Sequence, residues 1–232
     1  MPFLPSLLLN VGHALDHLFL LIFATAVSAI AHDFGVAGWE DMMPYTVGAF
    51  MMFGFASIPA GRMGDLWGRR QMMLVFFFGM GLSAIGVSLT QTPLQMGIAL
   101  TVLGVFSAIY HPVGIPMLVQ KAVRPGFTIG INGLAGNLGI ALAALSTGFL
   151  VAWQGWRVAF IVPGLVSIVC GLYLLGQRPM SRMHLLKRNP IQSNCPSMWH
   201  GELLRSWLQP PQPPACCSTS PPTAMPNCWP NV

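Results

Sequence analysis

The chain has 232 residues, of which 54% are hydrophobic and only 7% are charged, and its mean hydropathy is +0.64. A soluble domain usually has about a quarter of its residues charged, so too few polar side chains remain here to cover a surface facing water. This composition excludes an ordinary soluble domain, and the modest net charge of +5 gives no signal for nucleic-acid binding.

Six apolar runs follow one another along the chain, and each is long enough to cross a hydrocarbon core of about 30 Å. They cover approximately residues 7–31, 42–60, 72–89, 94–119 and 126–153, and a sixth run that ends near Leu175. Continuous runs of about twenty apolar residues favour helices over the short alternating strands of a membrane barrel. Residues 1–177 are therefore predicted to form an all-α domain of six transmembrane helices. The first run has no basic region before it and no clear cleavage site, so a retained helix is expected rather than a signal peptide.

The distribution of Lys and Arg predicts the orientation of these helices. The links after the second, fourth and sixth runs carry nearly all of the basic residues: Arg62, Arg69, Arg70, Lys121, Arg124, Arg178, Arg182, Lys187 and Arg188. The links on the opposite side carry only Arg157. Because basic links stay on the cytoplasmic side, both termini are expected in the cytoplasm of a multi-pass protein of the inner or plasma membrane.

The composition changes abruptly after Gln177. Residues 178–232 hold eleven of the twenty prolines and four of the five cysteines, and they show no periodic apolar face. Such a segment cannot bury enough apolar surface to offset the entropy of ordering it. The cysteine spacing matches no zinc-ligand pattern. A mostly disordered cytoplasmic tail is expected here.

The first and fourth runs contain polar and ionisable side chains within the membrane. In the first run these residues share one helical face because they are three or four residues apart: Asn10, His13, Asp16 and His17. The fourth run carries Ser107, Tyr110 and His111 immediately before Pro112. Counted from the cytoplasmic ends of their helices, Asp16 and His111 are at matched depths of roughly 12–14 Å. A carboxylate and an imidazole at one depth indicate a site that can take up and release a proton.

Simpler explanations remain for these residues. His13 and His17 could lie near the headgroups, and His111 could be a packing residue beside a proline. The three histidines could also suggest a metal site, but no cysteine or second acid completes it, so no metal is expected. No cofactor fingerprint is present, and no Ser, Cys or His constellation indicates covalent catalysis, so an enzyme is not expected.

The fifth run combines spaced glycines with two asparagines, Asn132 and Asn137. Its glycines recur at steps of three and four residues: Gly126, Gly130, Gly133, Gly136 and Gly139. This spacing is typical of close approach by a neighbouring helix. Within a bundle, the two amides could bind a substrate or hold a pair of helices together.

The charged stretch between the second and third runs, residues 61–71, is interpreted as a cytoplasmic hinge and gating element. It resembles the signature loop of the major facilitator superfamily, and the positions that match are Gly61, Asp65, Gly68, Arg69 and Arg70. Met63 and Leu66 replace residues that are usual in the signature. We expect Asp65 to pair locally with Arg69 or to cap a neighbouring helix end.

Four further phrases resemble the fosmidomycin-resistance type of efflux carrier, namely residues 10–17, 110–114, 132–139 and 155–157. The resemblance covers about residues 8–176 and implies two inverted three-helix repeats, with the first and fourth helices lining the pathway. The arginine that many proton-coupled members carry in the fourth helix is missing, as is the Gly-Pro pair of many antiporters in the fifth. The family has twelve spans, whereas six are found here, so a frame change or truncation is hypothesised at the start of the tail.

Three functions remain open for this chain. The first is proton-coupled efflux of drug-like or organic-anion substrates through the bilayer, together with a second copy or a separate C-terminal half. The second is an inactive fragment of a carrier. The third is a small membrane scaffold that binds a partner through an exposed helical face.

Overall fold

The computed structural model describes residues 3–120 and 122–177, and these described residues form helices and short connections. The predicted tail, 178–232, lies outside them. The elements in chain order are α1 (Phe3–Asp33), the 3₁₀ helix η1 (Trp39–Thr46), α2 (Val47–Phe55), α3 (Ser57–Trp67), α4 (Arg69–Ser88), α5 (Pro93–Ser107), the π-helical segment η2 (Tyr110–Gly114), α6 (Ile115–Val119), α7 (Pro125–Gln154) and α8 (Trp156–Gly176). The prediction of an all-α membrane protein is confirmed.

Within the described ranges, five helical stretches are long and apolar enough to cross a membrane, rather than the six that were expected. The span expected at residues 42–60 begins as η1 and continues as α2 and α3, which have nine and eleven residues. The amide of Ala56 donates to Met52 O at 2.9 Å, and the amide of Ala60 donates to Ala56 O at 3.0 Å, so helical bonding continues across the break. Residues 47–67 therefore form one interrupted helical path of roughly 30 Å.

The boundary expected at Ala60 is wrong, because α3 continues to Trp67 and includes most of the charged stretch. The break falls instead at Gly68, whose φ of +104° a side chain would disfavour. The small residues Gly61 and Gly64 do not end the helix. A methyl group at Gly61 would lie 3.3 Å from Pro112, and one at Gly64 would lie 2.9 Å from Val113, so these glycines let α3 pack closely on η2.

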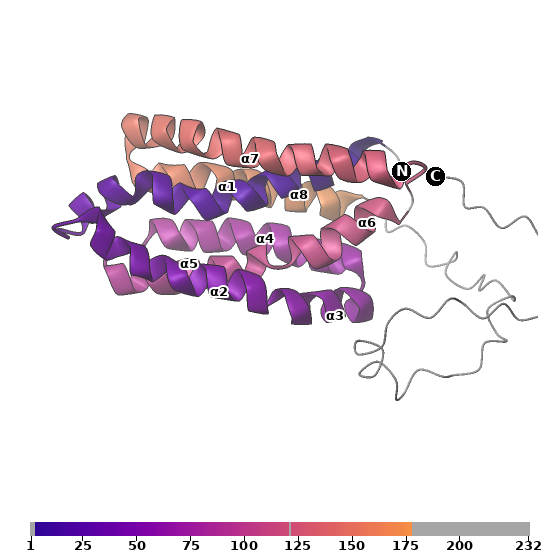
Figure 1. Ribbon diagram of the computed structural model, residues 1–232, viewed down its shortest axis with the longest axis horizontal. Helices are drawn as coiled ribbons and strands as arrows, with labels where there is room; N and C mark the ends of the chain where they lie inside the picture. Colours follow the sequence, from indigo (N-terminus) through magenta and orange to yellow (C-terminus); the bar gives the residue numbers. More distant parts are fainter. Residues whose placement is uncertain (1–2, 121, 178–232) are drawn as a thin grey trace, which may run out of the picture. The chain divides into compact units, whose positions relative to one another are not determined.

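The helices pack in three principal pairs, α1 with α7, α2 with α5, and α4 with α8 (Figure 1). In terms of spans, these pairs are one with five, two with four, and three with six. If spans one, two and three are exchanged for spans four, five and six, the pair one–five becomes the pair four–two and the reverse. The pair three–six becomes itself. This pairing is what two equivalent three-helix repeats produce.

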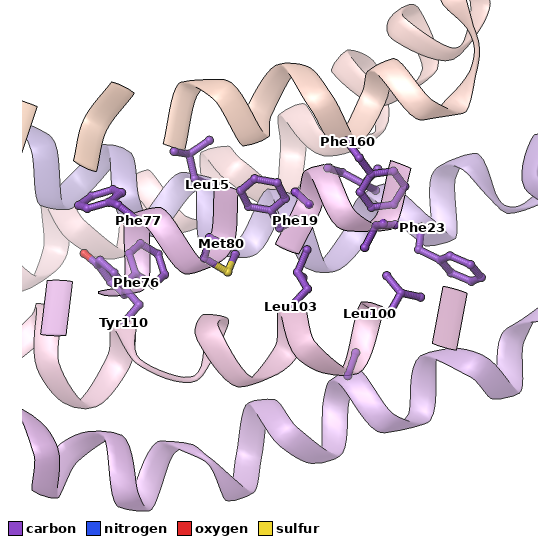
Figure 2. Packing of buried hydrophobic residues seen from close by; sticks show 14 of the residues in the cluster. Leu15, Phe19, Phe23, Phe76, Phe77, Met80, Leu100, Leu103, Tyr110 and Phe160 are labelled. Carbon is purple, nitrogen blue, oxygen red and sulfur yellow. The ribbon is translucent and has the colours of Figure 1, made fainter. Parts of the chain in front are cut away.

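The interior of the bundle is filled by large apolar side chains from α1, α4 and the fourth span, with Phe160 added from α8. Figure 2 shows Phe19, Phe76, Phe77, Met80, Leu103, Tyr110 and Phe160 packed against one another. Phe76 and Phe77 meet edge to face with ring centroids 5.1 Å apart. This core holds α1 and the fourth span in the positions from which their polar residues face one another.

Only part of the glycine series of α7 brings a neighbouring helix close. A methyl group at Gly139 would lie 2.1 Å from the carbonyl oxygen of Ala14, and one at Gly136 would lie 2.7 Å from the ring of His13. A methyl group at Gly126, Gly130 or Gly133, by contrast, would meet no described atom within 4 Å apart from its own stretch of helix. The close approach expected from the spacing therefore applies to the two glycines that face α1 and is wrong for the three before them.

We expect Gly139→Ala to destabilise the protein by about 1–3 kcal/mol, because the added methyl group forces α1 and α7 apart. The matched control is Gly133→Ala on the same helix, which adds the same methyl group in open space. This control should leave the stability unchanged or raise it slightly. Thermal unfolding in mild detergent measures both, and equal midpoints for the two variants would contradict the proposed α1–α7 contact.

Candidate functional site

The candidate site is centred on Asp16, a fully buried carboxylate in the middle of α1. The hydroxyl of Ser107, at the end of α5, donates a hydrogen bond to Asp16 Oδ1. The other oxygen, Oδ2, has no hydrogen-bond partner among the described residues, and Nε2 of His111 lies 3.5 Å from it. A carboxylate in such a setting is costly within a membrane, which makes this position the candidate for a functional site.

Three imidazole rings gather next to this carboxylate. His13 and His17 are one turn apart on α1, and their Nε2 atoms are 3.1 Å apart. The ring of His111, from η2, lies 5.2 Å from that of His13 and 5.6 Å from that of His17, measured between centroids. His13 is buried, whereas the side chain of His111 is 37% exposed, so the cluster opens to the outside of the bundle on one side.

A second set of polar contacts joins α1, η2 and α7 beneath the histidines. The amide nitrogen of Asn132 donates to Asn10 Oδ1 at 2.9 Å and to the hydroxyl of Tyr110 at 2.8 Å. The Tyr110 hydroxyl in turn donates to Leu9 O at 2.7 Å. The ring of Tyr110 stacks on His13 with centroids 4.8 Å apart. Each of these buried polar groups therefore has a partner on a different helix, which fixes the relative positions of the three elements.

The structure brings together seven of the eight residues predicted for the pathway: Asn10, His13, Asp16, His17, Tyr110, His111 and Asn132. Asn137 is the exception, because it lies on the exposed face of α7, five residues from Asn132. Sequence reasoning missed Phe53 of α2, whose ring meets His111 edge-on at 5.8 Å. An apolar residue in an apolar run gives no signal for such a contact.

The local geometry of η2 explains how His111 reaches α1. Pro112 and Pro116 lack an amide hydrogen, so the regular helical ladder cannot pass through this region. The backbone widens into the π-helical segment Tyr110–Gly114, a feature that is frequent at functional sites. Two consecutive side chains, Tyr110 and His111, consequently both face α1.

The charged residues expected to form the gating element make contacts at one end of the bundle. Asp65 and Arg69 pair at 3.6 Å across Gly68, which is the local pairing expected from the sequence. The guanidinium of Arg70 donates to three carbonyl oxygens at the end of α8: Leu174 at 2.8 Å, Leu175 at 3.1 Å and Gln177 at 2.7 Å. Carbonyls at a helix end lack intrahelical partners, so Arg70 caps α8 from α4.

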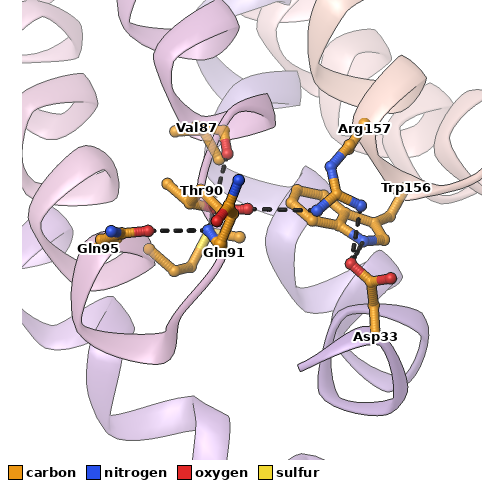
Figure 3. A network of polar contacts seen from close by, with 8 residues as sticks. Asp33, Val87, Thr90, Gln91, Gln95, Trp156 and Arg157 are labelled. Carbon is orange, nitrogen blue, oxygen red and sulfur yellow. Dashed lines mark hydrogen bonds and ion pairs between the residues drawn. The ribbon is translucent and has the colours of Figure 1, made fainter. Parts of the chain in front are cut away.

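A different polar network holds the opposite end (Figure 3). Asp33, at the end of α1, accepts hydrogen bonds from Arg157 at 2.7 Å and from the indole of Trp156 at 3.2 Å. Arg157 also donates to Thr90 O at 3.3 Å and lies over the Trp156 ring. These contacts tie α1, α8 and the α4–α5 turn together at one corner.

The sequence comparisons identify the family. The family model of the Major Facilitator Superfamily matches residues 9–213, which is most of the chain and extends past the end of α8. The chain belongs to this superfamily. It is a multi-pass membrane protein, and its family consists of transporters rather than enzymes.

Individual relatives match the chain at moderate identity. The tetracenomycin C resistance and export protein of Streptomyces glaucescens is 29% identical over 160 residues, covering 66% of this chain and 29% of that protein. The puromycin resistance protein of Streptomyces alboniger is 26% identical over 161 residues, or 68% of this chain and 31% of that protein. A 4-hydroxybenzoate transporter of Pseudomonas aeruginosa is 26% identical over 172 residues, with shares of 69% and 36%. The chain thus spans about a third of the length of these relatives.

We expect Tyr110→Phe to lower the stability by about 1–2 kcal/mol, because Asn132 and Leu9 each lose a buried hydrogen-bond partner. Tyr173→Phe is the matched control, since Tyr173 is 37% exposed on α8 and distant in sequence from the site. The unfolding midpoints of the two variants are compared in mild detergent. A Tyr110 variant as stable as the Tyr173 variant would show that the hydroxyl does not hold the three elements together.

Proposed function

We propose that this chain exports small drug-like or organic-anion substrates across the cell membrane in exchange for protons, together with a second six-helix unit. The observation that carries the proposal is the buried carboxylate of Asp16 beside the partly exposed ring of His111. The second unit proposed here is a further copy of the chain or a separate C-terminal half. The alternatives are a fragment without transport activity and a membrane scaffold.

The Asp16–His111 pair supports proton coupling through its chemistry. Asp16 is the acid deep within a span, and Ser107 satisfies only one of its oxygens. A proton on Oδ2 would remove the cost of a buried charge, and His111 could receive or deliver that proton because its ring is within 3.5 Å and reaches the outside of the bundle. Protonation and deprotonation would then favour different packings of α1 against η2, which is the kind of bias that alternating access requires.

The proposal of a second unit rests on the polar groups at the exposed faces of the bundle. Large apolar side chains exposed along α2 and α7, including Phe50, Phe55, Leu134 and Leu138, can face either lipid or a partner. The exposed amide of Asn137 and the open side of the histidine cluster add polar groups that lipid alone cannot satisfy. Six helices provide one wall of a pathway, and rocking around a central site requires an opposing wall.

The names of the relatives support the substrate class. Two of those reported above are named for antibiotic resistance, and one is named for the transport of an aromatic acid. Puromycin and 4-hydroxybenzoate are therefore suitable first probes, one a drug and the other an organic anion.

We expect the chain to raise the puromycin resistance, or lower the 4-hydroxybenzoate accumulation, of an efflux-deficient bacterium, and Asp16→Asn to abolish this effect. The amide is similar in size to the carboxylate but cannot take part in proton exchange. Glu40→Gln, an exposed acid in η1, is the matched control and should retain activity. Membrane levels of all variants are compared by immunoblot. Activity of Asp16→Asn at the level of the parent would refute proton coupling through this residue.

The absence of any effect from the parent chain expressed alone would favour the inactive fragment, the scaffold or a second unit that is a separate polypeptide. Co-purification in mild detergent singles out the fragment, because it retains no partner whereas the other two do. Co-expression of two differently tagged copies also shows whether the second unit is another copy of the chain.

The orientation proposed is that both termini lie in the cytoplasm. The ends of α3 and α6 lie at the end of the bundle where α1 begins (Figure 1), and the basic residues Arg62, Arg69, Arg70 and Arg124 belong to that end. The opposite end carries Arg157, paired with Asp33, together with the acids of η1. The positive-inside rule then places the basic end in the cytoplasm.

In a cysteine-free background, we expect Glu40→Cys to react with a membrane-impermeant maleimide added to intact cells. Arg124→Cys should react only after the membrane is permeabilised. The reverse pattern of labelling would show that the termini lie on the opposite side of the membrane.

A further inference from the structure

The three histidines next to Asp16 bring one ring nitrogen each close together, as histidines that bind a metal ion do. They come from two elements, α1 and η2, and one ligand nitrogen from each lies within 4.8 Å of the others. Zinc binds imidazole nitrogen at about 2.0–2.1 Å, so two ligand nitrogens in a tetrahedral site are about 3.3 Å apart. The Nε2 atoms of His13 and His17 are already 3.1 Å apart. Closing the widest separation to this value requires a ligand atom to move by roughly 1.5 Å, within reach of side-chain rotation.

The hydrogen bonds of His13 direct a lone pair into the cluster. Its Nδ1 lies 2.7 Å from the backbone carbonyl oxygen of Asn132. A carbonyl oxygen only accepts, so Nδ1 carries the hydrogen and the lone pair of Nε2 points into the cluster, where it accepts the Nε2 hydrogen of His17 at 3.1 Å. A metal ion bound between the two rings would displace that hydrogen as a proton. Imidazoles that bind metals characteristically donate their other ring nitrogen to a carbonyl or a carboxylate in this way. Gly136 makes this placement possible, because a methyl group there would lie 2.7 Å from the His13 ring.

Asp16 supplies the negative charge that such a site needs. Its Oδ2 is fully buried, has no hydrogen-bond partner among the described residues, and lies 3.5 Å from Nε2 of His111. A carboxylate behind a histidine orients the ring and raises its basicity as a ligand. It would also offset part of the charge of a divalent cation within the membrane.

We propose that His13, His17 and His111 bind a divalent transition-metal ion of the zinc type, with Asp16 orienting His111 and a fourth position open to water or a small ligand. Three imidazoles favour Zn²⁺, Cu²⁺, Ni²⁺ or Co²⁺ over Mg²⁺ and Ca²⁺, which prefer oxygen ligands. The partial exposure of His17 and His111 gives the ion a route of entry. This site concerns binding alone, so it stands whether or not the chain transports. It revises the expectation of no metal, which assumed that a further acid or cysteine was required.

The test is a titration of the full chain, purified in mild detergent, with Co²⁺ followed by its visible absorption and then displaced by Zn²⁺. All proteins in the comparison carry His184→Ala, His200→Ala and Ser at the four cysteine positions of the tail, so that no tail ligand contributes. The site variants are His17→Gln and His111→Gln. His32→Gln is the matched control, because His32 is exposed at the far end of α1. Elution profile and helical circular dichroism verify the fold of each protein.

We expect the parent to bind one Co²⁺ with the intense absorption of a four-coordinate ion, and Zn²⁺ to abolish that absorption. Each site variant should bind at least tenfold more weakly, and His32→Gln should bind as the parent does. No saturable binding by the parent, or parental affinity in either well-folded site variant, would overturn the proposal. Equal losses in His32→Gln and His17→Gln would overturn it as well, because they would show that binding is unspecific.

Discussion

The buried carboxylate of Asp16 is the constraint on which the arrangement of the candidate site depends. A charge or a polar group in the middle of a membrane helix cannot be left facing lipid, so α1 must turn this face toward the fourth span. Ser107 and His111 meet it there, one on each oxygen. The apolar residues of α1 that follow, including Phe19 and Ile22, then face the interior and build the core with Phe76 and Met80.

The second constraint is the close approach of α1 and α7. Gly136 and Gly139 remove the side chains that would keep the two helices apart, and the space is filled by the His13 ring and the Ala14 backbone. This contact brings the Asn132 carbonyl against His13 and the Asn132 amide against Tyr110. One pair of glycines thus links the packing of the bundle to the hydrogen-bonded positions of the site residues.

The two ends of the bundle are held by different chemistry. At the basic end, Arg70 of α4 caps the carbonyls of α8, and Asp65 pairs with Arg69 across the break at Gly68. At the opposite end, Arg157, Trp156 and Asp33 form one network around the α7–α8 turn.

Sequence by itself determined the class of the protein, the positions of most spans, the family signature and the polar face of the first helix. Apolar length and three- and four-residue spacing are local properties, which a single chain shows without its partners. The tertiary structure alone decided which glycines of α7 are contacts, that Asn137 is exposed while Asn132 is buried, and that the charged stretch is mostly helix. It also decided that three histidines from two elements share one place. The physical reason is that the spacing of residues along one helix places a side chain on a face, whereas the neighbour of that face depends on how the other helices pack.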